Sequence, residues 1–465
     1  MTRPSPHRVS ISSRITSRTE AGDPLSIALA PPPNESQDQR ARRKALEAEA
    51  KRVSDEIDRQ IDADAANLKR RRNTTKVLLL GQSESGKSTT LKNMQLTCAP
   101  KKWAAERGAW RVVIQLNLVR SVNVILDELG RHTELATRLS PLREVQKDLE
   151  RRLGASAIEE RFVPGLSPVN EDRDKRSSAD RRRTECAVRS SEGWKAAVFK
   201  IRPSTATSRQ SISLEEDETT RVIASCREEI HALWQDKAVK DAVWNRKVNL
   251  VDSAEFFLNH VHRVSRRDYV PSDDDIVRAR LRTVGVQEHR INFEASLDSG
   301  RDLLVFDVGG SRTSRAAWPA YFDDVHAIIF LAPINCFDEK LAEDPRVNRL
   351  EDSFLLWKSV CANKLLSSAQ LILFLNKMDL LDQKLKAGVK VKHYLTSFAD
   401  RSNDRATVSK YLKNKFMDIC RQESPSPRTP QVHLTSVVDT ITTAHTLGYV
   451  QDSILKTHLR RVNLL

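Results

Sequence analysis

Aromatic side chains and glycine are scarce in this sequence. Aromatic residues make up 5% of its 465 positions, and 14 positions are glycine. A chain of this length has room for two or three domains. Because 39% of the residues are hydrophobic but so few are aromatic, we expect some segments to lie outside any packed core.

Paired cysteines and long apolar runs are also missing. None of the six cysteines has CxxC spacing, which argues against a zinc site or a redox dithiol and fits a reducing, intracellular compartment. No run of about 18 apolar residues occurs, so we expect no transmembrane helix. No glycine follows Met1 and no cysteine precedes Cys98, so we expect no N-terminal lipidation site.

The N-terminal stretch "MTRPSPHRVSISSRITSR" has no acidic residue and no apolar segment of a secretory signal. Its Arg and Ser content is typical of a mitochondrial transit peptide, but Pro4 and Pro6 would interrupt the amphipathic helix of such a peptide. We therefore favour a disordered tail over residues 1–35.

Positive charge dominates, with a formal net charge of +15. Such a balance can indicate nucleic acid, an anionic membrane surface or basic disordered tails. The arginines cluster in polar stretches such as "RARRK" at 40–44 and "RRRTE" at 181–185, which favours tails. We expect no nucleic-acid partner, whereas electrostatic contact of the basic N-terminal region with anionic lipid stays open.

Apolar strands alternate with helical patterns in the second half of the chain. The expected strands are 76–80 near the N-terminal side, then "INFEASL" (291–297), "DLLVFDV" (302–308), "AIIFLAP" (327–333), "LILFLNKMD" (371–379) and "VHLTSV" (432–437). This order predicts an α/β fold with a mostly parallel six-stranded sheet flanked by helices. We expect it over 73–95 and 276–465, interrupted by an all-helical domain over 96–275. A helix over 36–72 precedes the sheet, and a disordered insert falls at about 163–220.

A phosphate-binding loop follows the first strand. "GQSESGKS", Gly81 to Ser88, has the spacing G-x-x-x-x-G-K-S between an expected strand and an expected helix. Glycines let backbone N–H groups wrap phosphate oxygens. Lys87 would reach the β and γ phosphates, and the Ser88 hydroxyl would face Mg²⁺.

A base-binding motif follows a later strand. Asn376, Lys377 and Asp379 form N-K-x-D, in which a carboxylate can accept from guanine N1–H and the 2-amino group together. Adenine offers no such pair of donors, which argues against a P-loop kinase or an ATPase. The carboxyl ends of the strands, where ligands of open α/β sheets bind, would hold both motifs.

Two further segments complete the predicted site. Asp307 and Gly310 form D-x-x-G, suited to Mg²⁺ and to the γ-phosphate, and Thr283 could complete the metal shell. Arg280 could neutralise charge on the transferring phosphate. Ser311, which follows Gly310, does not suit phosphate hydrolysis, because its side chain is too short to orient a water molecule.

The segments "ESGKSTTLKNM", "YVPSDDDIVRARLRT", "FDVGGSR", "FLNKMDL" and "LTSVVDT" together resemble the heterotrimeric G-protein α subunits, over roughly 40–160 and 221–465. The resemblance implies a Ras-like GTPase domain with a helical lid, GTP or GDP with Mg²⁺, and two switch segments, around Thr283 and from Asp307 to Trp318. It implies catalytic roles for Arg280, Lys87 and Ser311, and metal ligation by Ser88, Thr283 and Asp307. The nucleotide-binding residues implied by it are Glu84, Ser85, Gly86, Lys87, Ser88, Thr89, Asp252, Ser253, Val277, Arg278, Arg280, Thr283, Asp307, Gly310, Asn376, Lys377, Asp379 and Val437.

Departures from the family pattern predict slow turnover. Ser83 stands where the family usually has glycine, and Ser311 replaces its water-orienting glutamine. Ala316 and Ala317 replace two lysines, which puts contact with a βγ dimer in doubt. The C-terminus lacks the family's cysteine, since Val462 stands at that position.

The leading hypothesis is a transducer that couples a membrane receptor, through its C-terminal helix, to an effector whose identity stays open. A βγ dimer would bind the N-terminal helix and the second switch. The chain would act in the cytoplasm or at the cytoplasmic face of the plasma membrane. The alternative is a scaffold that holds GTP, or no nucleotide, without cycling.

Overall fold

The structure is a computed structural model. It describes residues 36–72, 74–129, 134–153, 187–188, 218–244, 250, 253–283, 286–293, 302–312, 314–341 and 343–461. The expected tail at 1–35, most of the expected insert at 163–220, and Val462 lie outside these residues. A first compact unit, up to Arg71, contains nearly all of α2 (Gln37–Arg72), and a second comprises the rest of the chain.

The second unit is built on a six-stranded sheet. Its strand order is β4 (Val286–Asn292), β5 (Asp302–Val308), β1 (Thr74–Gly81), β6 (Ala327–Pro333), β7 (Gln370–Asn376) and β8 (Gln431–Leu434). All neighbouring strands are parallel except β4 and β5, which are antiparallel. The expected α/β architecture is confirmed.

One expected strand was misplaced. We expected "INFEASL" at 291–297, but β4 runs from Val286 to Asn292. Its side chains alternate between buried and exposed, as on an edge strand with one solvated face. The polar first half of β4 therefore contains no continuous apolar run that would predict a strand.

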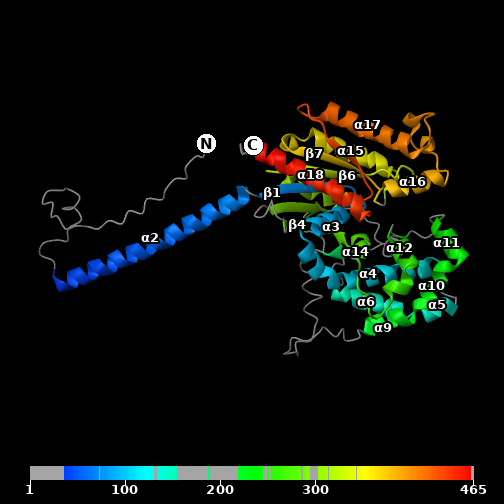
Figure 1. Cartoon of the computed structure of the whole chain (residues 1–465), viewed down its shortest axis with the longest axis horizontal. Helices are drawn as coiled ribbons and strands as arrows, with labels where there is room; N and C mark the ends of the chain where they lie inside the picture. The colour runs from blue at the N-terminus through cyan, green and yellow to red at the C-terminus, as the bar shows by residue number, and fades with distance from the viewer. Residues whose placement is uncertain are drawn as a thin grey trace, which may run out of the picture. The chain divides into compact units, whose positions relative to one another are not determined.

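Helices cover both faces of the sheet (Figure 1). On one face, α3 (Lys87–Cys98) and α18 (Thr440–Arg461) share a core with inward residues of the strands, including Leu79 and Phe374. On the other face, the covering elements are η2 (Ser314–Tyr321), α15 (Arg349–Ala362), α16 (Met378–Lys386) and α17 (Arg405–Glu423). Short 3-10 turns follow at Lys364–Leu366, Val391–His393 and Thr396–Phe398.

A separate hydrophobic core lies among the helices inserted between α3 and β4. These are α4 (Pro100–Leu129), α5 (Glu134–Arg138), α6 (Leu142–Arg152), α9 (Glu218–Ser225), α10 (Arg227–Gln235), α11 (Lys237–Trp244), α12 (Ala254–Asn259), α13 (Val261–Val264) and α14 (Asp273–Arg278). Helix α4 is long and apolar enough to cross a membrane, but 72% of its most apolar window is buried inside this protein. The apolar face of α4 therefore serves as the centre of the helical core.

A two-residue strand, β2 (Ala187–Val188), lies within the segment where we expected an insert. It pairs in parallel with β3 (Arg282–Thr283), which is part of the first switch segment.

Candidate functional site

The loop between β1 and α3 has the conformation that a phosphate-binding loop requires. Gly81 and Gly86 have φ of 140° and 104°, and Glu84 has φ of 61°, so three residues adopt positive φ. A Cβ atom on Gly86 would lie 2.4 Å from the Asn376 amide nitrogen, so only glycine fits there. The backbone N–H groups of this loop precede the N-terminus of α3, where anions are favoured.

Lys87 is buried in the same loop. Its ammonium donates to the carbonyl oxygens of Gly81 at 2.8 Å and of Gln82 at 2.6 Å. Burial lowers the pKa of Lys87 to about 8, although Asp307 opposes that shift. A bound phosphate would add negative charge beside this buried amine and so favour its protonated form.

Two oxygen groups suited to a metal meet at the end of β5. The Ser88 hydroxyl donates to Asp307 Oδ2 at 2.7 Å, and Asp307 is 1% exposed. A hydroxyl and a carboxylate are hard oxygen donors, the kind that Mg²⁺ prefers. The residues therefore fit the expected ion. The Thr283 backbone belongs to β3, but its side chain lies outside what the structure describes.

The expected catalytic arginine is held at its side chain and at its backbone. Arg280 Nη2 pairs with Glu84 Oε1 at 3.1 Å. Its backbone N–H donates to Asn117 Oδ1 at 2.6 Å, and its carbonyl accepts from Asn117 Nδ2 at 2.9 Å. Asn117 is one of several buried polar residues of helix α4, and sequence reasoning missed it because its partner is 163 positions away. Both ends of one amide therefore hold the backbone that carries the guanidinium.

Ser311 is bonded within its own segment. It is 6% exposed, and its hydroxyl and that of Ser314 hydrogen-bond each other at 2.7 Å. Its carbonyl accepts from the N–H groups of Ser314 and Arg315, which begins η2. Ser311 thus contributes to the local fold of the second switch.

At the base end, Asn376 joins two of the expected motifs. Its amide nitrogen donates to the Ser85 carbonyl at 2.8 Å. Its Oδ1 accepts from the N–H of Val437 at 3.1 Å, so a guanine contact by that N–H would have to share or replace this bond. Lys377 has φ of 65°, and the N–H of Asp379 donates to the hydroxyl of Ser436 at 3.1 Å. These bonds bring the base motif directly against the phosphate loop.

The remaining candidates lie on the helical side. Val277 is fully buried in the helical core, so only its backbone could contact a nucleotide. The Arg278 guanidinium lies 4.4 Å from the centre of the Phe256 ring. Burial lowers the pKa of Arg278, while the negative charges of Asp379 and Asp439 oppose that shift. Ser253 is the N-cap of α12, Thr89 lies in the first turn of α3, and Asp252 lies outside the described residues.

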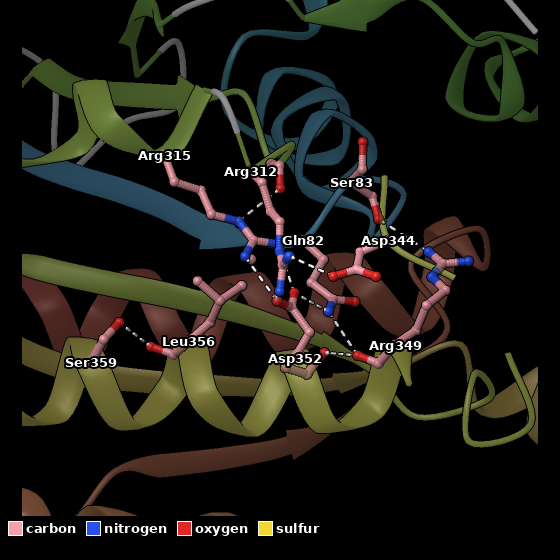
Figure 2. Close-up of polar contacts among 12 residues, drawn as sticks. Gln82, Ser83, Arg312, Arg315, Asp344, Arg349, Asp352, Leu356 and Ser359 are labelled. Carbon is pink, nitrogen blue, oxygen red and sulfur yellow. Dashed lines mark hydrogen bonds and ion pairs between the residues drawn. The ribbon is translucent and has the colours of Figure 1, made fainter. Parts of the chain in front are cut away.

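A polar network joins the phosphate loop to the second switch and α15, as Figure 2 shows. Arg349 Nη2 donates to the carbonyl of Ser83 at 3.1 Å and Nη1 pairs with Glu84 at 3.3 Å. Arg315 of the switch pairs bidentately with Asp352 of α15. Sequence reasoning missed Arg349 and Asp352, since neither lies in a nucleotide-binding motif.

Comparisons with known proteins identify the family to which the chain belongs. A family model described as G-protein alpha subunit matches residues 51–454. The chain belongs to the G-protein alpha subunit family. The expected resemblance and the fold class, a Ras-like domain interrupted by a helical domain, are therefore confirmed.

Individual family members are similar over nearly their whole length. The guanine nucleotide-binding protein alpha-4 subunit of Mycosarcoma maydis is 30% identical over 577 aligned positions, covering 98% of this chain and 97% of that protein. The alpha-2 subunit of Neurospora crassa is 30% identical and covers 90% of this chain and 97% of its own length. The G(o) alpha subunit of Geodia cydonium is 30% identical with the same coverage. The family consists of guanine nucleotide-binding proteins that transduce signals.

Proposed function

We propose that this G-protein alpha subunit binds GTP with Mg²⁺, couples a membrane receptor to an effector, and hydrolyses GTP slowly. One observation carries the proposal: candidate groups for phosphate, metal and base meet through direct bonds at one edge of the sheet. Asn376 bonds Ser85 of the phosphate loop, and Ser88 of the same loop bonds Asp307. Ligands of open α/β sheets bind at this edge.

The chemistry follows from the side chains. Mg²⁺, when bound, would neutralise charge on the β and γ phosphates, and Ser88 and Asp307 would hold it. Lys87 would exchange its two carbonyl acceptors for phosphate oxygens. Arg280 would leave Glu84 and stabilise the charge on the transferring phosphate, while Arg349 keeps Glu84 paired.

Slow hydrolysis follows from Ser311 and Ser83. The Ser311 hydroxyl is hydrogen-bonded to Ser314. It also lacks the reach of a glutamine side chain and the second polar group with which an amide orients water. Ser83 adds a side chain where the second switch approaches, since a Cβ on Gly310 would lie 2.4 Å from the Ser83 nitrogen. Arg280, Lys87 and the metal would carry the residual rate.

The proposed partners are those that are general for the family. The receptor would contact the C-terminal helix α18, and the effector is open. A βγ dimer would contact α2 and the second switch, where Ala316 and Ala317 are exposed and offer no charge. Peripheral contact of the basic N-terminal region with anionic lipid would add membrane attachment.

Equilibrium binding tests the nucleotide proposal. Full-length protein should bind a fluorescent GTP analogue in Mg²⁺, more weakly in EDTA, and GTP but not ATP should displace it. Ser88→Ala should lose the Mg²⁺ dependence, whereas Thr97→Ala, an exposed threonine at the other end of α3, should keep it. Equal displacement by ATP would contradict the proposal.

The nucleotide content of the purified protein separates the transducer from the non-cycling scaffold. Bound GDP supports turnover, because a scaffold without hydrolysis would retain GTP or remain empty.

A further inference from the structure

Gln82 is the first variable residue of the phosphate loop, and its side chain leaves the loop. It is 1% exposed, and its amide nitrogen donates to Asp352 Oδ2 at 2.5 Å and to the Arg349 carbonyl at 2.7 Å (Figure 2). Both acceptors belong to the first turn of α15. Gln82 therefore joins the phosphate loop directly to α15.

The Asp352 carboxylate is shared. It is 3% exposed and accepts from Arg315 Nη1 at 3.0 Å and from Nη2 at 2.6 Å. Arg312 lies within ion-pair distance, at 3.9 Å. Bidentate arginine–carboxylate pairs are strong and directional, so this carboxylate helps to hold Arg315 and the second switch in place. The Gln82 amide is thus hydrogen-bonded to the group that holds the switch.

The backbone of the second switch also lies close to the backbone of the phosphate loop. A Cβ atom on Gly310 would lie 2.3 Å from the Gln82 carbonyl carbon, so the two backbones are in close contact. Arg315 Nε donates to the Gly310 carbonyl at 3.2 Å, and this links the contact to the ion pair with Asp352. Meanwhile the Gln82 carbonyl accepts from Lys87 Nζ at 2.6 Å. Gln82 therefore contacts the Lys87 ammonium through its backbone carbonyl, and through its side chain it contacts Asp352, the carboxylate paired with Arg315 of the switch.

We propose that Gln82 is a positioning residue that ties the phosphate loop to the second switch through Asp352. Its amide keeps the switch docked on the loop even when no γ-phosphate is present. The nucleotide-dependent movement of the switch is consequently smaller with Gln82 than without its amide. The nucleotide part of this inference rests on the proposed GTP binding, whereas the docking does not.

Limited proteolysis of the full-length chain tests the tie. Trypsin cleaves after arginine, and mass spectrometry would quantify peptides that end at Arg312 or Arg315. In nucleotide-free protein, Gln82→Met, which keeps the length of the side chain without its donor, should be cleaved there about tenfold faster than the parent chain. A non-hydrolysable GTP analogue should reduce that difference, because the γ-phosphate then holds Gly310.

A matched control separates the tie from general loosening. Gln115 is also buried, at 2% exposure, but its amide donates to Thr220 within the helical core. Gln115→Met should leave cleavage at Arg312 and Arg315 unchanged. Equal acceleration by Gln115→Met would overturn the proposal, and so would a parental cleavage rate in Gln82→Met. If Gln82→Met does not fold, Gln82→Asn, one methylene shorter, should give the same acceleration.

Fluorescence of Trp318 gives a second readout. Its indole N–H donates to the Gly309 carbonyl at 3.0 Å, so its emission reports the position of the switch. With a Trp318→Phe background subtracted, the emission difference between the GDP and GTP-analogue states should be larger in Gln82→Met. An unchanged difference would contradict the proposal. If the parent chain bound neither nucleotide, the proposed function would fail, and the nucleotide-free proteolysis would still decide the role of Gln82.

Discussion

Replacing Ser311 with glutamine should accelerate GTP hydrolysis. The serine hydroxyl is one bond from Cβ and bonds Ser314 at 2.7 Å. A glutamine amide sits about 2.5 Å farther from the backbone, by standard bond lengths, and brings both a donor and an acceptor. A group positioned to assist proton transfer contributes at least about 100-fold, equivalent to about 2.7 kcal/mol of the barrier. We therefore expect Ser311→Gln to raise the single-turnover rate by about 100-fold.

The assay is release of γ-phosphate from preloaded protein after addition of Mg²⁺. Ser314→Ala is the matched control, because it removes a hydrogen-bond partner of the Ser311 hydroxyl without adding an amide, and it should change the rate by less than about threefold. If Ser311→Gln binds the GTP analogue normally but hydrolyses GTP no faster than the parent chain, Ser311 does not limit turnover. Adding Ser83→Gly would then test the other departure in the loop.

Three further predictions concern the same site. Arg280→Ala should slow single-turnover hydrolysis by about 1,000-fold, and hydrolysis at the parental rate would remove Arg280 from the mechanism. Burial lowers the pKa of Lys87 to about 8, so its ammonium is lost as pH rises through that value. GTP affinity should therefore fall by about tenfold per pH unit above pH 8, and titrations of Lys87→Met should lack this slope. Asp379→Asn removes the carboxylate that would accept from the guanine donors. Competition assays should therefore show weaker GTP binding and stronger binding of a xanthine nucleotide, whose 2-carbonyl accepts from an amide. An unchanged preference for GTP would exclude Asp379 from base recognition.

Short sequence patterns predicted the phosphate loop and the buried strands, because these depend mainly on residues that are close together in the sequence. The strand–glycine–helix pattern around Gly81 and Lys87 specified the loop, because positive φ at fixed positions and a buried strand leave few alternatives. The buried strands β5, β6 and β7 were equally clear, since each is a continuous apolar run. Edge strand β4 was misplaced, because only alternate side chains are buried there.

Long-range side-chain contacts could not be predicted in the same way. Gln82 occupies a variable position of its motif, and nothing local shows that its amide bonds Asp352, 270 positions later. Nothing in the sequence distinguishes Asn117 from the other polar residues of α4, and only the fold brings the Arg280 backbone to its amide. Such pairs depend on how the helices pack around the loop, and a single sequence does not display that packing.

Single-turnover hydrolysis by the unmodified full-length chain tests the central claim most directly. Protein loaded with GTP in EDTA would receive Mg²⁺, and the conversion of bound GTP to GDP would be followed over time. We predict slow but complete conversion that depends on Mg²⁺ and is about 1,000-fold slower in Arg280→Ala. Conversion as fast as that of a relative with glutamine at the position of Ser311, or no binding of GTP, would contradict the account.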